Sequence, residues 1–219
     1  MLILALDAAL ARCSVALLRD GLVLAQRHED TSRGHAALLP PMVQAVLAEA
    51  GVAAGELSAV AAGVGPGGFT GIRTALALAE GLALGAGLPV VGVTTGEALA
   101  EAVPDEQRAG REIWIAIDNR RGRVVLERFA AGSLLALGGP EAMDEAALPR
   151  PGGPVAVAGD AALAVAARLA ARGGNVLLAG PRLPEAVALG RVAARRLAGE
   201  LPALAAQPLY VEPPAVRQP

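Results

Sequence analysis

A glycine-rich loop followed by a strongly apolar helix constrains this sequence more than any other feature. An apolar run at residues 59–64 leads through Gly-Val-Gly-Pro-Gly-Gly-Phe-Thr-Gly-Ile-Arg, residues 63–73, into a helical pattern that extends to about Gly85. A strand, a glycine loop and a helix in that order can bind phosphate, because N–H groups at a helix start attract anions. The helix is apolar on nearly all sides, so both of its sides must be covered. The segment is therefore a candidate phosphate site, a contact surface, or both.

The remaining apolar runs and turn signals of the first half predict an α/β fold. An Asp-Gly pair at residues 20–21 joins two apolar runs and is typical of a hairpin, so the chain is expected to begin with three meandering strands. Apolar residues at helical spacing follow, and Thr94 or Thr95 can cap a short later helix. The expected elements are strands at 2–6, 14–18, 22–26, 59–64 and 88–93, and helices at 35–50, 69–84 and 96–102.

The second half resembles the first. Residues 113–118, Ile-Trp-Ile-Ala-Ile-Asp, echo residues 2–7, Leu-Ile-Leu-Ala-Leu-Asp, and each Asp leads through a turn into another apolar run. Such a repeat is typical of a duplicated fold, so two lobes of similar βββαβαβα topology are expected, the second one reduced. The polar stretch at 104–111 predicts the boundary, with an N-terminal lobe at residues 1–103 and a smaller lobe with a proline-rich tail at 104–219.

Charge and composition exclude several classes of protein. The sequence has no lysine, and its 19 arginines against 21 acidic residues give a formal net charge of -2. This balance argues against autonomous nucleic-acid binding through a basic face. The single cysteine, Cys13, excludes an intramolecular disulfide. We expect a cytoplasmic protein without membrane contact, because no apolar run is long enough to span a bilayer and no secretory leader is recognisable.

Two lobes that each begin with a strand ending in Asp resemble the actin, sugar kinase and Hsp70 superfamily, which has a ribonuclease H-like topology. Within it, the chain is similar to the TsaB (YeaZ) family along nearly its whole length. The segments that carry this resemblance are Asp7 with Cys13-Ser-Val-Ala-Leu17, His35-Ala-Ala-Leu-Leu-Pro40, Gly65-Pro-Gly-Gly-Phe-Thr-Gly-Ile-Arg73, Gly81-Leu-Ala-Leu84 and Pro208-Leu-Tyr210.

The resemblance implies a role in placing the threonylcarbamoyl group on N6 of adenosine 37 in tRNAs that read codons beginning with A. It implies a non-catalytic scaffold subunit that dimerises with its catalytic homologue TsaD, with TsaE joining them as the ATPase. It further implies a homodimer when the chain is alone, and contact with tRNA only through the complex.

The histidines argue against catalysis by this chain. The resemblance implies a His-x-x-x-His metal pair in the catalytic homologue, whereas here His35 is followed four residues later by Leu39 and the other histidine is His28. We therefore expect no metal site and no catalytic residue. Two alternatives stay open, an autonomous ATP-dependent transferase or kinase of the superfamily, and a peptidase. The absent His pair and the Ala8-Ala9 turn count against the first, and the lack of a Ser-His-Asp set counts against the second.

The glycine loop offers backbone N–H groups to an anion but lacks the lysine of a P-loop. Ala8 and Ala9 stand where the family carries hydroxyl side chains. A structural turn is therefore favoured over an occupied nucleotide site. We expect no firmly bound cofactor, with ATP or ADP at the junction with partners kept as a candidate. The candidate vestigial phosphate or nucleotide contacts are Asp7, Gly65, Gly67, Gly68 and Thr70.

The apolar helix then predicts a protein interface. Small residues four apart, from Gly71 to Ala83, make a smooth stripe that lets another helix approach closely. The helix that starts near His35 also has surplus apolar surface. The competing interpretation is that both helices are buried within this chain. The predicted interface residues are His35, Leu38, Leu39, Met42, Val43, Val46, Gly71, Ala75, Leu78, Ala79 and Leu82.

Overall fold

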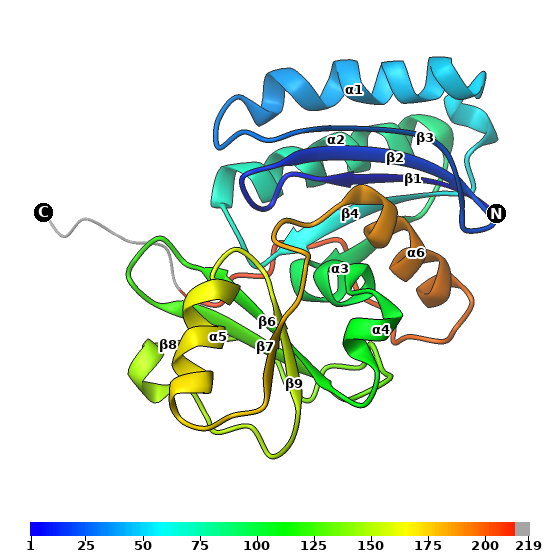
Figure 1. The fold of residues 1–219 in the computed structure, drawn as a ribbon. Coiled ribbons are helices and arrows are strands. Elements are labelled where there is room, and N and C mark those ends of the chain that lie inside the picture. The colour runs from blue at the N-terminus through cyan, green and yellow to red at the C-terminus, as the bar shows by residue number, and fades with distance from the viewer. Residues whose placement is uncertain (213–219) are drawn as a thin grey trace, which may run out of the picture.

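The structure is a computed structural model that describes residues 1–212, and it contains two five-stranded mixed sheets (Figure 1). The strand order is β3-β2-β1-β4-β5 in the first sheet and β8-β7-β6-β9-β10 in the second, so both sheets have the same topology. In each, two antiparallel pairs are followed by two parallel neighbours. The predicted two-lobed α/β fold with a reduced second lobe is confirmed.

The elements follow the apolar patterns of the sequence closely. The strands of the first sheet are β1 (Leu2–Asp7), β2 (Cys13–Arg19), β3 (Leu22–Glu29), β4 (Ala59–Gly65) and β5 (Val90–Thr94). Those of the second sheet are β6 (Glu112–Asp118), β7 (Val124–Phe129), β8 (Glu141–Met143), β9 (Val155–Ala158) and β10 (Val176–Leu178). The helices are α1 (His35–Ala50), α2 (Phe69–Ala86), α3 (Thr95–Ala102), α4 (Asp105–Arg108), α5 (Ala162–Ala171) and α6 (Ala186–Leu197), with 3-10 turns at Ala54–Glu56 and Glu145–Ala147.

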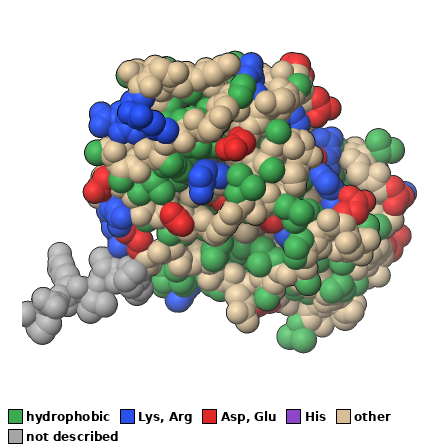
Figure 2. Space-filling model, turned by 90° about the horizontal axis from the view of Figure 1, so that it is seen from below, with side chains coloured by type: hydrophobic (Ala, Val, Ile, Leu, Met, Phe, Trp, Pro, Cys, Tyr) green, Lys and Arg blue, Asp and Glu red, His purple; other side chains and the backbone are tan. Residues whose placement is uncertain are grey.

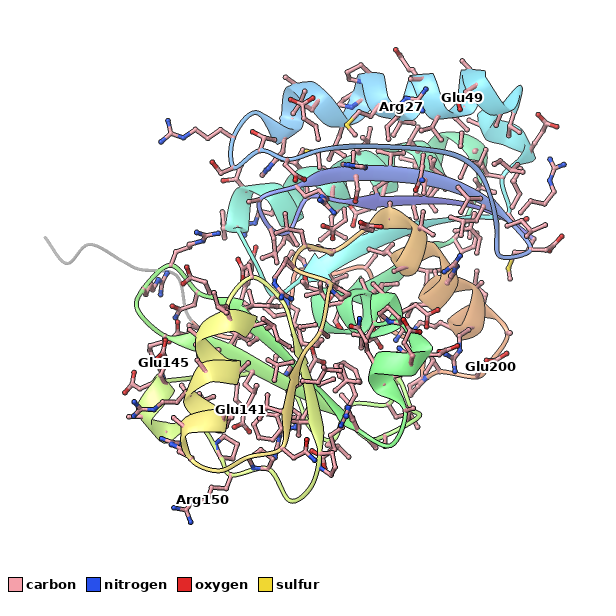
Figure 3. All side chains as sticks on the ribbon, viewed as in Figure 1. Arg27, Glu49, Glu141, Glu145, Arg150 and Glu200 are labelled. Carbon is pink, nitrogen blue, oxygen red and sulfur yellow. The ribbon has the colours of Figure 1, made fainter. Side chains whose placement is uncertain are left out.

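The helices form layers around the first sheet. Helices α1 and α2 pack on one face, and α6 packs on the other face together with α3, between that sheet and the second lobe (Figure 1). Helix α5 packs on β6, β9 and β10 of the second sheet. The ion pair between Arg27 of β3 and Glu49 of α1 joins two outer elements, whereas Arg150 and Glu200 lie at the periphery (Figure 3).

The C-terminal part of the chain returns to the first lobe. Helix α6 follows the second lobe in sequence but packs on β1, β2 and β5 of the first. Leu204, Ala206 and Leu209 also pack against the core of the first lobe. One hydrophobic core includes residues of both sheets, such as Ile3 and Ile115, because α3 and α6 bring their apolar sides between them. The two sheets therefore share a hydrophobic core, and the boundary between residues 103 and 104 stays a prediction.

A buried polar network holds α3 and α6 together within this shared core. Arg196 of α6 donates hydrogen bonds to the carbonyl oxygens of Gly92 (2.7 Å) and Pro202 (2.6 Å), and it pairs with Glu97 of α3. Glu97 also closes the capping box with Thr94 that was expected at this helix start. The two carbonyl oxygens and the carboxylate accept hydrogen bonds from the guanidinium of Arg196, so these buried N–H groups are not left unpaired.

Glu127 of β7 lies at the same junction. Its side chain is buried, and its Oε2 has no partner among the described residues. A Cβ added at Gly96 would come within 1.8 Å of that oxygen, so glycine is required where the carboxyl group meets α3. Burial, and secondly the negative charge of Glu97, raise the pKa of Glu127 to about 8. The carboxyl is therefore largely protonated at neutral pH.

Part of the predicted interface lies inside this chain's own core. The stripe of small residues on α2 faces this chain's own sheet, because α2 packs mainly on β4. At Gly71 a Cβ would lie 1.9 Å from the carbonyl oxygen of Ala8, so glycine is needed there for close packing within the chain. The predicted interface residues that are buried in this core, and so are unavailable to a partner, are Leu39, Val43, Val46, Gly71, Ala75 and Ala79.

Ala79→Arg is expected to prevent stable folding. Ala79 has no exposed surface, and an arginine there would place an unpaired charge and a long side chain between α2 and the first sheet. Overpacking together with a buried unpaired charge costs on the order of 4 kcal/mol or more, which is a large share of the stability of a domain. Circular dichroism and urea unfolding would measure the loss. A cooperative transition like that of the wild type would contradict the inward orientation of this stripe.

Glu127→Gln is expected to change how stability depends on pH. Since the pKa of Glu127 is about 8 in the folded chain against an ordinary value of 4.5, the folded state holds this proton more tightly. The contribution of the protonated group to stability is complete below about pH 4.5 and is lost as the pH rises through about 8. The wild type should lose up to about 1.4 kcal/mol per pH unit between roughly pH 7 and 8. Glu127→Gln should remove this decline.

Urea unfolding at a series of pH values above 7 would test this, because that range lies above the pKa of the other strongly shifted carboxyl, Asp7, at about 7. Glu145→Gln, which changes an exposed glutamate of a 3-10 turn, is the matched control and should keep the wild-type profile. An identical decline in Glu127→Gln and in the wild type would show that Glu127 does not titrate in this range.

Candidate functional site

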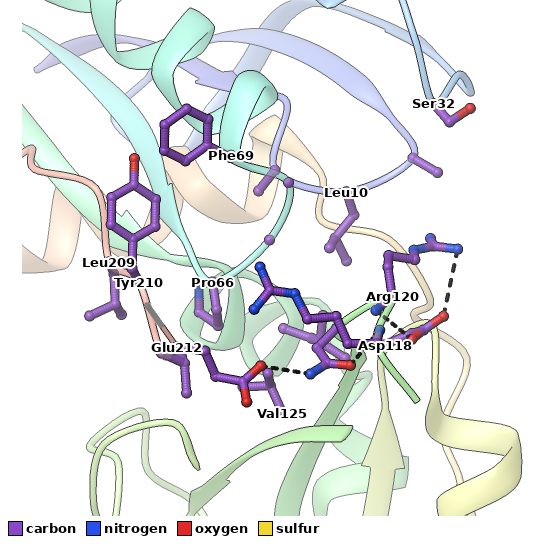
Figure 4. Close-up of a pocket in the computed structure, with 18 of the residues that line it drawn as sticks. Leu10, Ser32, Pro66, Phe69, Asp118, Arg120, Val125, Leu209, Tyr210 and Glu212 are labelled. Atoms are coloured by element: carbon purple, nitrogen blue, oxygen red, sulfur yellow. Dashed lines mark hydrogen bonds and ion pairs between the residues drawn. The ribbon is translucent and has the colours of Figure 1, made fainter. Parts of the chain in front are cut away.

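The two lobes enclose a cavity of about 590 Å³ (Figure 4). Most of its walls come from four segments that lie far apart in sequence, and Ser32, His35 and Val125 also line it. On the first lobe these are the turn after β1 at residues 9–11 and the glycine loop at 66–69. On the second lobe they include the turn after β6 at 117–121, and the chain segment 209–212 closes a further side. The cavity therefore lies where the carboxyl ends of β1, β4 and β6 meet, as expected for ligand sites in α/β folds.

The glycine loop at this cavity is folded onto the chain itself. The N–H of Gly68 donates a hydrogen bond of 2.7 Å to the carbonyl oxygen of Ala9. A Cβ at Gly67 would lie 2.2 Å from the same oxygen. The glycines thus let the turn after β1 approach the start of α2. One N–H group that could have held a phosphate is already used, and Ala8 and Ala9 add no hydroxyl donor.

Asp7 does not line the cavity. Its side chain is completely buried, and Oδ1 accepts a hydrogen bond of 3.1 Å from the N–H of Ala9. Oδ2 has no partner in residues 1–212 and lies against Gly63, where a Cβ would be 2.0 Å away. Burial raises the pKa of Asp7 to about 7, with a smaller opposing effect from the Ala9 hydrogen bond. The carboxyl caps its own turn, so its orientation does not suit a magnesium ligand in the cavity.

The other predicted phosphate contacts are divided between the cavity and the rest of the molecule. Gly67 and Gly68 line the cavity. Gly65 is buried at the end of β4 with a φ of 97°, which favours glycine, and Thr70 is exposed on α2 outside the cavity. The structure does not bring the predicted set together around one ligand, and the residues present do not fit a nucleotide phosphate held by this chain alone.

The second-lobe wall is a hydrogen-bonded turn. Asp160 accepts a hydrogen bond of 2.8 Å from the N–H of Asp118, and the N–H of Arg120 donates one of 2.8 Å to Asp118. The guanidinium of Arg120 lies 3.3 Å from Asp160, and burial as the largest cause raises the pKa of Asp160. The single guanidinium of Arg120 thus lies close to both carboxyl groups of the turn. Asp160 follows the apolar run of β9 as Asp118 follows that of β6, and this parallel is a signal in the sequence that could have placed it near Asp118.

Tyr210 and Glu212 were missed by sequence reasoning. Both line the cavity, and Figure 4 shows Tyr210 beside Phe69 at its mouth. Their partners are separated from them by 137 residues for the Arg73–Tyr210 hydrogen bond and by 89 residues for the Arg123–Glu212 pair. A local pattern does not reveal contacts of this range. The proline-rich composition of the tail indicated only an extended chain.

The two histidines are apart: His35 lines the cavity, whereas His28 does not. The Nε2 of His35 lies 3.1 Å from the carbonyl oxygen of Thr31, and its ring contacts the start of α2 near Gly71. His28 belongs to β3 and faces Ser14 of β2 in the register of the sheet. Residues 1–212 contain no group of three or more His, Cys, Asp or Glu side chains that could hold a metal ion.

The surface seen from below shows apolar, basic and acidic side chains intermixed on that face, without a continuous basic patch (Figure 2). This agrees with the net charge of -2 and gives no electrostatic footprint for nucleic acid on that face. Among the described helices, none combines the length and apolar character needed to cross a membrane.

Comparisons with known proteins relate this chain to one family. Residues 27–162 match the model of the family described as TsaD, tRNA N6-adenosine threonylcarbamoyltransferase. The tRNA threonylcarbamoyladenosine biosynthesis protein TsaB of Escherichia coli (strain K12) is 44% identical over 124 residues, which are 57% of this chain and 53% of that protein. The chain thus matches about half the length of this curated relative.

Solved structures extend the similarity over the whole fold. YeaZ from Pseudomonas aeruginosa superposes with a TM-score of 0.80 at 32% identity, covering 95% of this chain and 99% of that one. The activator of the 2-hydroxyisocaproyl-CoA dehydratase from Clostridium difficile has a TM-score of 0.52 at 10% identity, covering 94% of this chain and 100% of that one. This last likeness concerns the fold alone.

Proposed function

The chain belongs to the TsaB/YeaZ family, and we propose from this that it takes part in forming the threonylcarbamoyl group on N6 of adenosine 37 in tRNAs that read codons beginning with A. Its role there is that of a non-catalytic scaffold subunit, which pairs with the catalytic homologue TsaD. TsaE joins the pair as the ATPase, and tRNA is contacted through the complex. ATP or ADP is held at the junction between subunits.

The geometry of the cavity supports the non-catalytic role. The Gly68 N–H is bonded to Ala9, and the Asp7 carboxyl is buried beneath the turn rather than directed at a ligand. His28 and His35 lie on different elements, so they cannot act as the His-x-x-x-His pair of the catalytic homologue. A nucleotide bound at a subunit junction would need donors from the partner.

The proposed scaffold role rests mainly on the exposed side of α2. Ala77, Gly81 and Gly85 are exposed and four residues apart. They are rotated by roughly 200° from the buried stripe that contains Ala75 and Ala79. No atom lies within 4 Å of a Cβ added at Gly81 or Gly85, so nothing within the chain requires glycine at either position.

These glycines lower the stability of the isolated chain. Glycine in the interior of a helix costs about 1 kcal/mol relative to alanine, and Gly81 is such a position, whereas Gly85 lies in the last turn of α2. A partner helix that packs closely along α2 would explain both, because only glycine leaves room for backbone contact. Leu84, which is 87% exposed, and the half-buried Leu78 and Leu82 supply apolar contacts on either side of this stripe.

Helix α1 continues this surface beside α2. Its exposed side carries Ala37, Pro41 and Ala45, again four residues apart, and the half-buried Leu38 and Met42 pack against the same core as α2. Four helices, two from each subunit, would cover the surface in a complex with TsaD. When the chain is alone, the same surface pairs two copies into a homodimer.

Gly81→Arg is expected to abolish pairing while leaving the fold intact, since the position is exposed and open. Size-exclusion chromatography with light scattering would follow the homodimer, and calorimetric titration would measure binding to TsaD, with at least a roughly hundredfold loss of affinity expected. Ala167→Arg, on the exposed side of α5, is the matched control and should bind normally. Wild-type affinity in folded Gly81→Arg would contradict an interface along α2.

Reconstitution tests the role in the reaction. The chain, TsaD and TsaE are combined with ATP, bicarbonate, threonine and tRNA, and the modified adenosine is measured after omission of each protein. Product is expected only when TsaD is present, with a strong loss when this chain is omitted. Product formed by this chain without TsaD would overturn the scaffold role in favour of an autonomous transferase.

A further inference from the structure

The segment at residues 209–212 crosses from the first lobe to the second at the mouth of the cavity. The N–H of Leu209 donates a hydrogen bond of 2.8 Å to the carbonyl oxygen of Val64 at the end of β4. Glu212 accepts a hydrogen bond of 2.8 Å from the side chain of Asn119 (Figure 4). It also pairs with Arg123, and both partners belong to the second lobe. The short segment is therefore bound at both ends to different lobes.

Two glycines of the first sheet let the backbone of residues 204–209, which leads to this segment, pack closely on the sheet. A Cβ at Gly92 of β5 would lie 2.5 Å from the carbonyl oxygen of Ala205. At Gly65 it would lie 3.1 Å from the carbonyl oxygen of Leu209. The N–H of Gly92 also donates to the carbonyl oxygen of Leu204 at 3.2 Å. The backbone of residues 204–209 thus lies directly on the sheet, which fixes where residue 210 begins to cross.

Tyr210 anchors the middle of the segment to the start of α2. Its ring stacks on Phe69 with centroids 5.4 Å apart and planes inclined by 20°. Arg73 lies over the Phe69 ring at 3.8 Å and donates a hydrogen bond of 2.8 Å to the Tyr210 hydroxyl. Stacking and cation–π contacts of this kind each contribute about 0.5–1.5 kcal/mol. Both rings are 40% or more exposed, so the contact stands at the surface rather than in a core.

The turn of the second lobe is arranged in advance to receive Glu212. The Oδ1 of Asn119 accepts hydrogen bonds from the N–H groups of Arg121 (2.9 Å) and Arg123 (3.0 Å). This fixes the amide orientation and directs Nδ2 toward the carboxylate of Glu212. Arg123 is held as well, since its guanidinium donates to the carbonyl oxygen of Ala142 and lies 3.5 Å from Asp144. Two fixed donors therefore meet one carboxylate.

We propose that residues 209–212 form a strap that closes the cavity, with Glu212 as the latch that releases from Asn119 and Arg123 when the cavity opens. The strap supplies one wall, so the cavity is open to its full width only after the strap lifts. The shared core behind the cavity keeps the lobes in place, so movement of the strap is the low-cost route of entry. The Arg123–Glu212 ion pair is partly exposed, so it can break and form again without unfolding of the core.

The single tyrosine of the sequence makes the strap directly observable. In protein labelled with 3-fluorotyrosine, fluorine NMR gives one resonance, and the stacked ring should place it away from its position in denatured protein. Glu212→Ala removes the latch and should increase the released population roughly tenfold, moving the resonance toward the denatured position. Glu200→Ala removes the same charge from the Arg195–Glu200 ion pair elsewhere and should leave the resonance unchanged.

Two further variants separate the latch from a general loss of structure. Glu212→Gln, whose amide oxygen can still accept hydrogen bonds from Asn119 and Arg123 but carries no charge, should release the strap less than Glu212→Ala. Gly92→Ala, which pushes against Ala205, should release the strap without touching the latch. The proposal fails if Glu212→Ala leaves the resonance in place, or if Glu200→Ala shifts it equally.

Discussion

The close contact between the turn after β1 and the start of α2 determines much of this molecule. Gly67 and Gly71 let the backbone of Ala8 and Ala9 approach to a distance that no side chain permits. This contact fixes the direction of α2 over the sheet and so decides which of its small residues face inward. It also takes up the N–H of Gly68. A loop whose sequence suggests phosphate binding therefore serves close packing within the chain. The helix after it directs Gly81 and Gly85 outward.

The sequence was sufficient to predict what depends on local periodicity and turn chemistry. The Asp-Gly hairpin, the Thr94 cap and the repeated strands ending in Asp7 and Asp118 all lie where expected. The glycine loop forms a turn and the start of α2, and the absence of a nucleotide there stays a prediction. Helical spacing also identified α1 and α2 as elements with apolar residues on more than one side. The family resemblance was confirmed, and its proposed partners remain to be tested.

What the sequence could not predict depends on long-range packing. Two small-residue stripes occur on α2, through Ala75 and Ala79 and through Ala77 and Gly81, and periodicity alone does not tell which one meets the sheet. The burial of Asp7 follows from the position of Gly63 on a neighbouring strand. The return of α6 to the first lobe and the path of residues 204–212 depend on contacts about a hundred residues or more apart, such as Arg196 with Gly92 at a separation of 104.

The position of α6 has a consequence for synthesis on the ribosome. This helix covers one face of the first sheet, yet almost the whole second lobe is translated before it. During that interval β1, β2 and β5 lack the helix that completes their apolar side, and the buried Arg196 has not yet joined Glu97. The lobe that is translated first is thus completed late. One apolar face of its sheet stays uncovered, and so open to aggregation, until α6 leaves the exit tunnel.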